Sequence, residues 1–305
     1  MDEIRYISRF EEDFPDRLRF IPSCPSGLYV KGGLPDPDIK TVAIVGARSC
    51  SEYGLRMAEY FGAHLAACGV QIVSGMARGI DGVAQRAALE AGGRSFGVLG
   101  CGADIIYPKE NRDIYEMIRG HGGLITEYPP GTPPLGRNFA SRNRIISGLC
   151  DLLLVIEARL KSGTSITVNN ALEQGRDIFA VPGRLTDGLS AGCNKLIAEG
   201  AGAALCPDDI LKALGLLCEA PVTVRRTGKT GKTGKKGNEN ELCLERPELT
   251  QRERLVFSCL DLYPKTVDEI VRTCRLSVSE TVEILTGLSI KGCVKECAKS
   301  NYIRL

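Results

Sequence analysis

Five short, predominantly apolar runs divide residues 41–181 into a regular alternation. They read TVAIV (41–45), VQIV (70–73), SFGVL (95–99), LLLVI (152–156) and DIFAV (177–181), without regular polar alternation. Such runs suit strands that are buried on both faces of a parallel sheet. Apolar residues at spacings of three and four over 55–68 predict a helix between the first two runs, and 80–91 and 164–175 have the same pattern. The sequence therefore predicts an α/β fold with a doubly wound, mostly parallel sheet and right-handed crossovers.

Composition shifts predict four segments. Residues 1–40 are rich in Pro and Gly with one strand-like piece, LYV (28–30), and we expect an N-terminal extension packed on the sheet of a domain spanning 41–218. Residues 219–248 include VTVRRTGKTGKTGKKG, which has six basic residues, no acid and little apolar content, and we expect a basic flexible linker. Residues 249–305 contain two capping-box patterns, Thr266 with Glu269 and Ser277 with Glu280, and end in two strand-like pieces. This predicts a small winged-helix-like domain.

Composition excludes several classes of protein. Hydrophobic residues make up 43% and charged residues 25% of the 305 residues, as in globular proteins. No apolar run approaches the roughly 20 residues that span a bilayer, and the acidic N-terminus does not resemble a secretion signal. The thirteen cysteines form no CxxC pair, so we expect reduced thiols in a cytoplasmic protein and no metal site. The formal charge is only +2, so any nucleic-acid binding must depend on local clusters.

Three glycine-containing turns follow the first three predicted strands. They are VGARS (45–49), SGMARGID (74–81) and GCGAD (100–104). Open α/β sheets bind ligands at the carboxyl ends of their strands, and a glycine turn that enters a helix offers free N–H groups to a phosphate. Glycines also simply make tight turns, but three turns in register favour an anion site. We expect Asp81 and Asp104 to have structural roles.

Two further segments concentrate cations. RNFASRNR (137–144) has three arginines, two asparagines and a phenylalanine, and apolar IISGL follows it, which predicts a helix anchored in the core with a projecting basic end. Arginines beside an aromatic ring are typical of single-stranded nucleic-acid binding, although a charge run is usually a solvated helix face. EARLKSGTS (157–165) follows the fourth strand, and we expect it to lie beside the first turn at the switch point of the sheet.

Other motifs fail. The pattern GxGxxG is absent, because Ile105 occupies the third position after Gly100 and Gly102, so no dinucleotide cofactor is expected. The linker TGKT lacks the earlier glycines of an ATP-binding loop. Neither His64 nor His121 has an obvious nucleophile nearby, and no pair of carboxylates has a convincing catalytic spacing. We therefore expect no catalytic residue, no metal and no cofactor.

Eight blocks resemble the DNA-processing protein A (DprA/Smf) family over roughly residues 15–210. They are VGAR (45–48), SGMARGID (74–81), GCGADIIYPKEN (100–111), TEYPPGTPP (126–134), RNRIISGL (142–149), EARLKSGTSIT (157–167), ALEQGRDIFAVPG (171–183) and NKLIAEGA (194–201). The resemblance implies a Rossmann-like fold and a cytoplasmic, homodimeric protein of natural transformation (competence) and DNA recombination. It implies that the protein binds and protects incoming single-stranded DNA and loads the RecA recombinase onto it in the presence of single-strand-binding protein. The helical domain that some relatives carry at the N-terminus has no counterpart in this sequence.

The resemblance places a basic DNA pocket at Arg48, Arg142, Asn143, Arg144 and Lys161, with Phe139 positioned to stack on a base. Ala47, Ala140 and Ser165 depart mildly from the family pattern without removing a charge. With the turn residues, the candidate DNA-binding residues are Arg48, Ser49, Gly75, Arg78, Phe139, Arg142, Asn143, Arg144, Arg159, Lys161, Ser162, Gly163 and Thr164.

An enzymatic alternative stays open at this point. The expected fold resembles that of nucleotide phosphoribohydrolases, which place a catalytic Glu within a few residues of a Gly-Thr pair. Here Gly163-Thr164 is followed by no acid before Glu173, which favours a binding protein without catalysis. In the C-terminal unit, the candidate recognition helix (278–291) has two acids against Lys291 alone, so we expect it to contact protein or its own chain instead of DNA.

Overall fold

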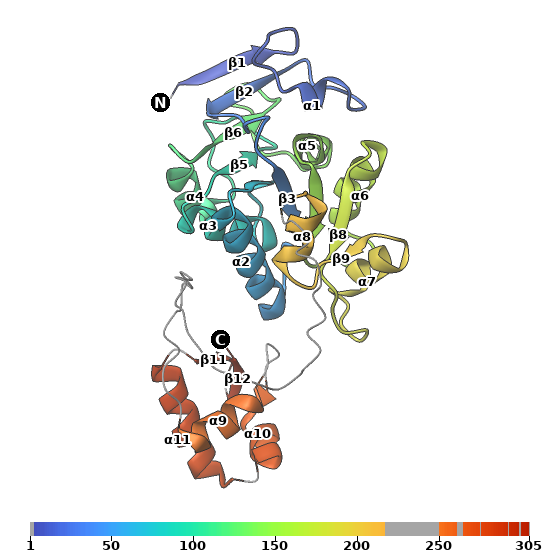
Figure 1. Ribbon diagram of the computed structural model, residues 1–305. Helices are drawn as coiled ribbons and strands as arrows, with labels where there is room; N and C mark the ends of the chain where they lie inside the picture. The colour runs from blue at the N-terminus through green and yellow to red at the C-terminus, as the bar shows by residue number, and fades with distance from the viewer. Residues whose placement is uncertain are drawn as a thin grey trace, which may run out of the picture. The chain divides into compact units, whose positions relative to one another are not determined.

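The structure, a computed structural model, describes residues 3–216, 250–260, 265–274, 276–291, 293–298 and 300–304. It divides into two compact units, Met1–Ala220 and Pro221–Leu305, which run from blue to yellow and from orange to red in Figure 1. The predicted linker, 219–248, lies outside the described residues.

A nine-stranded sheet forms the centre of the first unit within the described residues, in the order β1-β2-β6-β5-β4-β3-β7-β8-β9. The seven strands β6-β5-β4-β3-β7-β8-β9 are parallel to one another. At the other edge, β1 pairs with β2 and β2 pairs with β6 in antiparallel register. The strands are β1 (Ile4–Ser8), β2 (Gly27–Gly32), β3 (Thr41–Val45), β4 (Gln71–Ser74), β5 (Ser95–Val98), β6 (Gly122–Thr126), β7 (Leu152–Val155), β8 (Asp177–Ala180) and β9 (Gly202–Ala203).

Helices cover both faces of this sheet (Figure 1). They are α1 (Asp16–Arg19), α2 (Glu52–Ala67), α3 (Ile80–Glu90), α4 (Arg112–Met117), α5 (Gly136–Leu149), α6 (Thr164–Glu173), α7 (Ala191–Ala198) and α8 (Pro207–Ala213), with the 3₁₀ turn η1 (Lys109–Asn111). In β3, Val42 and Ile44 pack in one core with α2, α3 and α8. Ala43 and Val45 pack in a second core with α1, α5, α6 and α7. This two-sided burial explains why the β3 sequence is apolar from Val42 to Val45.

The doubly wound, mostly parallel sheet predicted from the sequence is confirmed. All five predicted strands are present, and the predicted helices correspond to α2, α3 and α6. The sequence analysis missed β1, β6 and β9. Only Ile7 is buried in the edge strand β1, and β6 begins with two glycines, of which Gly122 has a φ of +158°.

The second unit is a winged-helix arrangement, as predicted. It contains α9 (Gln251–Ser258), β10 (Lys265–Thr266), α10 (Val267–Cys274), α11 (Val278–Ile290), β11 (Val294–Ala298) and β12 (Asn301–Arg304), and its sheet has the order β10-β12-β11. Both predicted capping boxes form, since Glu269 and Glu280 each accept a hydrogen bond from the backbone N–H of Thr266 and Ser277 respectively. Buried apolar residues from all three helices, including Val256, Ile270 and Leu285, form its core.

Every helix within the described ranges is too short or too polar to cross a bilayer.

Candidate functional site

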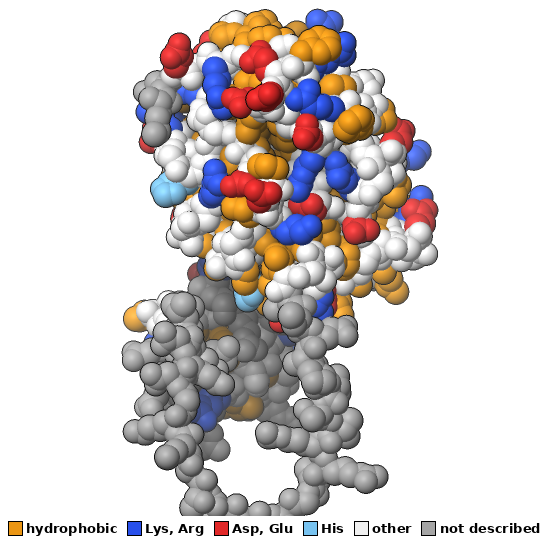
Figure 2. All heavy atoms as spheres, turned by 45° about the horizontal axis from the view of Figure 1, so that its top comes forward, with side chains coloured by type: hydrophobic (Ala, Val, Ile, Leu, Met, Phe, Trp, Pro, Cys, Tyr) orange, Lys and Arg blue, Asp and Glu red, His pale blue; other side chains and the backbone are white. Residues whose placement is uncertain are grey.

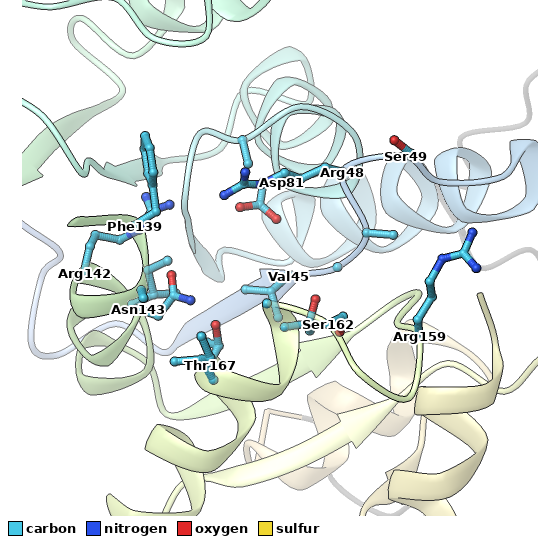
Figure 3. A pocket seen from close by; sticks show the side chains of 18 of the residues that line it. Val45, Arg48, Ser49, Asp81, Phe139, Arg142, Asn143, Arg159, Ser162 and Thr167 are labelled. Carbon is cyan, nitrogen blue, oxygen red and sulfur yellow. The ribbon is translucent and has the colours of Figure 1, made fainter. Parts of the chain in front are cut away.

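A cavity of about 440 Å³ opens at the carboxyl edge of the sheet, where β3 and β7 lie side by side. The chain leaves β3 toward β4 on one side and leaves β7 toward β8 on the other, so this is the switch point of the sheet. The cavity is lined by residues 45–49 at the end of β3, Ala77 and Asp81 after β4, one face of α5, the turn 159–164 with the start of α6, and Leu189. Figure 3 shows the labelled side chains of these segments gathered around Val45.

The β3 and β7 turns are joined by a buried carboxylate. Glu157 is 2% exposed and accepts hydrogen bonds from the Ser51 backbone N–H at 2.9 Å and from the Ser51 hydroxyl at 2.5 Å. Ser51 is the N-cap of α2, and its hydroxyl also accepts from the Gly54 N–H at 3.1 Å. This contact fixes the turn that carries Arg48 and Ser49, both exposed, at the mouth of the cavity.

Arg142 lies in the cavity wall as a buried cation, only 3% exposed. Its Nη1 donates to the carbonyl oxygen of Gly75 at 2.7 Å and also to that of Val98, at the ends of β4 and β5. Its Nε has no hydrogen-bond partner within the described part of the chain. Burial lowers the pKa of Arg142 to about 10, against the opposing effect of the Asp81 carboxylate, so the guanidinium stays charged at neutral pH.

Asp81 faces this arginine from the start of α3 and is 7% exposed. Its Oδ2 accepts from the Gly75 N–H at 3.1 Å. Burial raises the pKa of Asp81, while the charge of Arg142 acts to lower it. A Cβ at Gly75 would lie 2.7 Å from Asp81 Oδ2 and 2.8 Å from Arg142 Nη2, so only glycine leaves room for both charged groups. Asp81 thus has the structural role that the sequence indicated, as does Asp104, which accepts from the Gly131 N–H.

The Phe139 ring contacts two arginines, Arg48 and Arg142, and a second aromatic ring, Tyr107. The guanidinium carbons of Arg48 and Arg142 are 5.5 and 5.8 Å from its ring centroid. Tyr107 stacks on it with centroids 5.4 Å apart and an interplanar angle of 28°. Phe139 therefore positions the two cations, a role that the sequence analysis did not predict.

The start of α6 forms the opposite wall with Ser162, Gly163, Thr164 and Thr167. Ser162 Oγ is buried and finds no hydrogen-bond partner among the described residues. Gly163, the N-cap of α6, has no side-chain cap, and it places the N-terminus of this helix in the cavity wall, an arrangement known from phosphate sites. Thr167, less than one turn after Thr164, was missed in the sequence analysis, although i, i+3 spacing on an expected helix could have found it.

The cavity brings together nine of the thirteen predicted residues: Arg48, Ser49, Phe139, Arg142, Asn143, Arg159, Ser162, Gly163 and Thr164. Gly75 and Arg78 line a smaller adjoining cavity of about 30 Å³. Lys161 is exposed in the turn between two lining residues but does not itself line the cavity.

Arg144 is not brought to the cavity. Its Nη2 and Nη1 donate to Glu127 Oε2 at 2.6 Å and Oε1 at 2.8 Å, and its Nε donates to the Ser23 carbonyl oxygen at 2.8 Å. The turn 100–104 is also absent from the lining, and its Gly100 packs against Phe139 instead. The expectation that all three glycine turns would form one anion site is therefore wrong for the third turn.

The charge of this site is local. On the face shown in Figure 2, Lys and Arg side chains are interspersed with Asp and Glu, and no broad patch of one sign covers that face. The cavity instead combines the buried cation Arg142, the exposed cations Arg48 and Arg159, a helix N-terminus and hydroxyl groups. This set of donors suits a phosphorylated ligand.

Comparisons with known proteins point to one protein family. The family model described as "DNA recombination-mediator protein A" matches residues 5–215, and that of the "DprA winged helix domain" matches 244–298. The chain is 42% identical over 205 residues to the DNA processing protein DprA of Streptococcus pneumoniae, covering 67% of this chain and 72% of that protein. It is 34% identical to the protein Smf of Synechocystis, covering 98% and 80%.

Two solved structures are similar to this fold. The X-ray structure of DprA from Streptococcus pneumoniae matches with a TM-score of 0.65 at 40% identity, covering 69% of this chain and 74% of that one. A structure of DprA from Helicobacter pylori, described for its unique single-stranded DNA binding mode, matches with a TM-score of 0.61 at 28% identity, covering 70% and 98%. Because the family model matches residues 5–215, more than half of the chain, this chain belongs to the DprA/Smf family.

Proposed function

We propose that this chain binds single-stranded DNA at the cavity between β3 and β7. The observation that carries the proposal is the convergence of Arg48, Arg142 and the α6 N-terminus, three phosphate-attracting groups from distant segments, on one cavity of about 440 Å³. Phosphate contacts of this kind, beside aromatic rings, bind unpaired strands with little sequence preference. The single-stranded DNA binding mode described for the Helicobacter pylori relative supports the choice of single strands.

We propose a wider role as well, which family membership supports. The protein acts in natural transformation, where it protects incoming single-stranded DNA and loads RecA onto it in the presence of single-strand-binding protein, and it works as a homodimer. A strand-exchange assay with RecA on DNA coated by single-strand-binding protein tests the loading role, and light scattering tests the dimer. No stimulation of RecA by the protein would contradict the loading role.

The proposed activity is binding without catalysis. The buried carboxylates nearest the switch point, Asp81 and Glu157, both accept backbone N–H hydrogen bonds. A carboxylate held in this way serves the architecture of the turn. Release of free base from nucleoside monophosphates by the purified protein would instead support the phosphoribohydrolase alternative.

Fluorescence-polarisation titrations test the DNA-binding proposal directly. We expect the protein to bind a labelled oligothymidylate more tightly than a duplex of equal length. Arg48→Glu and Lys161→Glu weaken that binding roughly tenfold at low salt, and each phosphate that a variant no longer neutralises reduces the slope of log K against log salt by roughly 0.7.

Lys212→Glu is the matched control, because it makes the same charge change at an exposed lysine of α8, a helix that contributes no residue to the cavity lining, whereas Lys161 lies between two lining residues. It should leave the affinity and the salt slope unchanged. Equal affinities of all three variants and the unmodified protein at two salt concentrations would overturn the proposal.

A further inference from the structure

The ring expected to stack on a base, Phe139, is already surrounded. Tyr107 stacks on it, the guanidinium groups of Arg48 and Arg142 lie within 5.8 Å of its centroid, and Gly100 packs against its edge. A base that reached Phe139 would have to displace at least one of these groups. The aromatic surface available to a ligand at this site lies one ring further out.

That outer ring is Tyr107, which is 42% exposed. Its backbone is fixed, since the Tyr115 hydroxyl donates to the Tyr107 carbonyl oxygen at 2.9 Å and accepts from the Tyr107 N–H at 3.2 Å. Tyr115 is itself buried. Tyr107 therefore presents an aromatic ring that is held at its backbone and backed by Phe139, a preorganised surface for stacking.

Tyr107 is continuous with the phosphate cavity. The small cavity that Tyr107 lines shares Arg48, Ala77, Phe139 and Arg142 with the main one, and Arg78 also lines it. The Arg78 guanidinium is 3.8 Å from Glu110, and both side chains are more than 60% exposed. Such an exposed ion pair is weak, so a phosphate can replace the carboxylate at little cost.

We propose that Tyr107 is a base-stacking residue of the site, and that a bound strand runs from the α6 N-terminus past Arg48 to Tyr107 and Arg78. This inference rests on the proposed function, because it assigns a second part of the same DNA site. The strand places a phosphate in the main cavity, the next base on the outer face of Tyr107 and the following phosphate near Arg78. Stacking accepts any base, so this extension adds affinity without sequence preference.

Tyr107→Leu and Tyr107→Phe test the inference against two labelled strands, an oligothymidylate and an abasic strand of equal length and charge. Tyr107→Leu should weaken binding of the oligothymidylate roughly tenfold and leave binding of the abasic strand unchanged, because only a base can stack. Tyr107→Phe should retain the affinity of the unmodified protein for both strands. Tyr60→Leu, a tyrosine of 46% exposure on α2 that lines neither cavity, should leave both affinities unchanged.

The outcomes separate this inference from the proposed function. If Arg48→Glu weakens binding and Tyr107→Leu binds the oligothymidylate like the unmodified protein, the stacking assignment is wrong and the DNA site stands. An equal loss on the abasic strand would also overturn the assignment, since it would show a loss of structure and not of stacking; thermal melting of each variant checks its fold. If the unmodified protein binds neither strand, the proposed function itself fails.

Discussion

At the scale of single residues, Arg142 combines structure and function. Its guanidinium bridges the carbonyl oxygens that end β4 and β5 and also supplies charge to the cavity. We expect Arg142→Met to reduce the free energy of unfolding by about 3–5 kcal/mol, because it removes the charge that opposes the buried Asp81 carboxylate and the donor to two backbone carbonyl groups. Urea denaturation measures this loss.

Arg159→Met is the control for that experiment, because Arg159 is exposed at the same cavity. It should reduce DNA affinity without changing the urea midpoint. Identical midpoints for Arg142→Met and the unmodified protein would show that the bridge contributes nothing to stability.

Residue roles were the hardest feature to predict from the sequence. The spacing of RNFASRNR predicted a basic helix correctly, but it gave Arg142 and Arg144 the same role. In the structure Arg142 reaches the cavity, and Arg144, two residues further along α5, points to Glu127. Residues two positions apart on a helix point in directions about 200° apart, so the role of each arginine depends on which residues pack against its face of α5. That partner, Glu127, comes from a strand end that the sequence analysis did not identify.

At the scale of elements, the Glu127–Arg144 pair ties the segment after β6 to α5. The side chains are 17% and 14% exposed. Burial acts to raise the pKa of Glu127, but hydrogen bonds and charge from Arg144 outweigh it, and the pKa lies below its usual 4.5. Since the folded pKa is lower than the unfolded one, the pair stabilises the fold above pH 4.5, and this contribution is lost as the pH falls further.

We expect Glu127→Gln to reduce the free energy of unfolding by about 2 kcal/mol at pH 7. The difference from the unmodified protein should shrink as the pH falls below 4.5, because protonation makes the native carboxyl resemble the amide. Thermal melting over a pH series measures it, and a difference that grew toward acid would contradict the assignment.

Strand and helix elements were largely predictable where burial is two-sided. β7 is apolar throughout, and β3 is apolar from Val42 to Val45, because helices cover both faces of the sheet. The missed elements lack that signature: β9 has two residues, and β1 lies at the edge. In β6, Gly122 and Gly123 allow the backbone of neighbouring segments to approach closely, since a Cβ on either would collide with the backbone of Ser95 or Gly33 respectively. Glycines at these positions remove the apolar pattern by which a buried strand is predicted from sequence.

At the scale of the whole molecule, we expect the winged helix to be dispensable for binding single strands. On α11, Glu280 pairs with Arg252, and Lys291 at its C-terminal end pairs with Glu253 at 2.8 Å. Its exposed residues include Val278, Val282 and Ile290, which suit contact with protein better than with phosphates. Deleting 249–305 should change affinity for an oligothymidylate by less than about threefold.

This deletion keeps the basic segment 219–248, so any change in affinity reports on the winged helix alone. Polarisation titrations of the full and shortened chains at two salt concentrations make the comparison. A loss of tenfold or more would assign a DNA-binding role to this domain.

The segments that line the cavity lie far apart in the sequence, and this has a consequence during translation. The chain leaves the ribosome with Arg48 and the β3 wall early, whereas the β7 turn and Thr164 emerge more than a hundred residues later, and the bond between Ser51 and Glu157 can close only then. Domains generally fold as units during translation. A nascent chain therefore exposes Arg48 before the cavity is complete. It cannot bind a polynucleotide in the cavity until the turn after β7 has been synthesised.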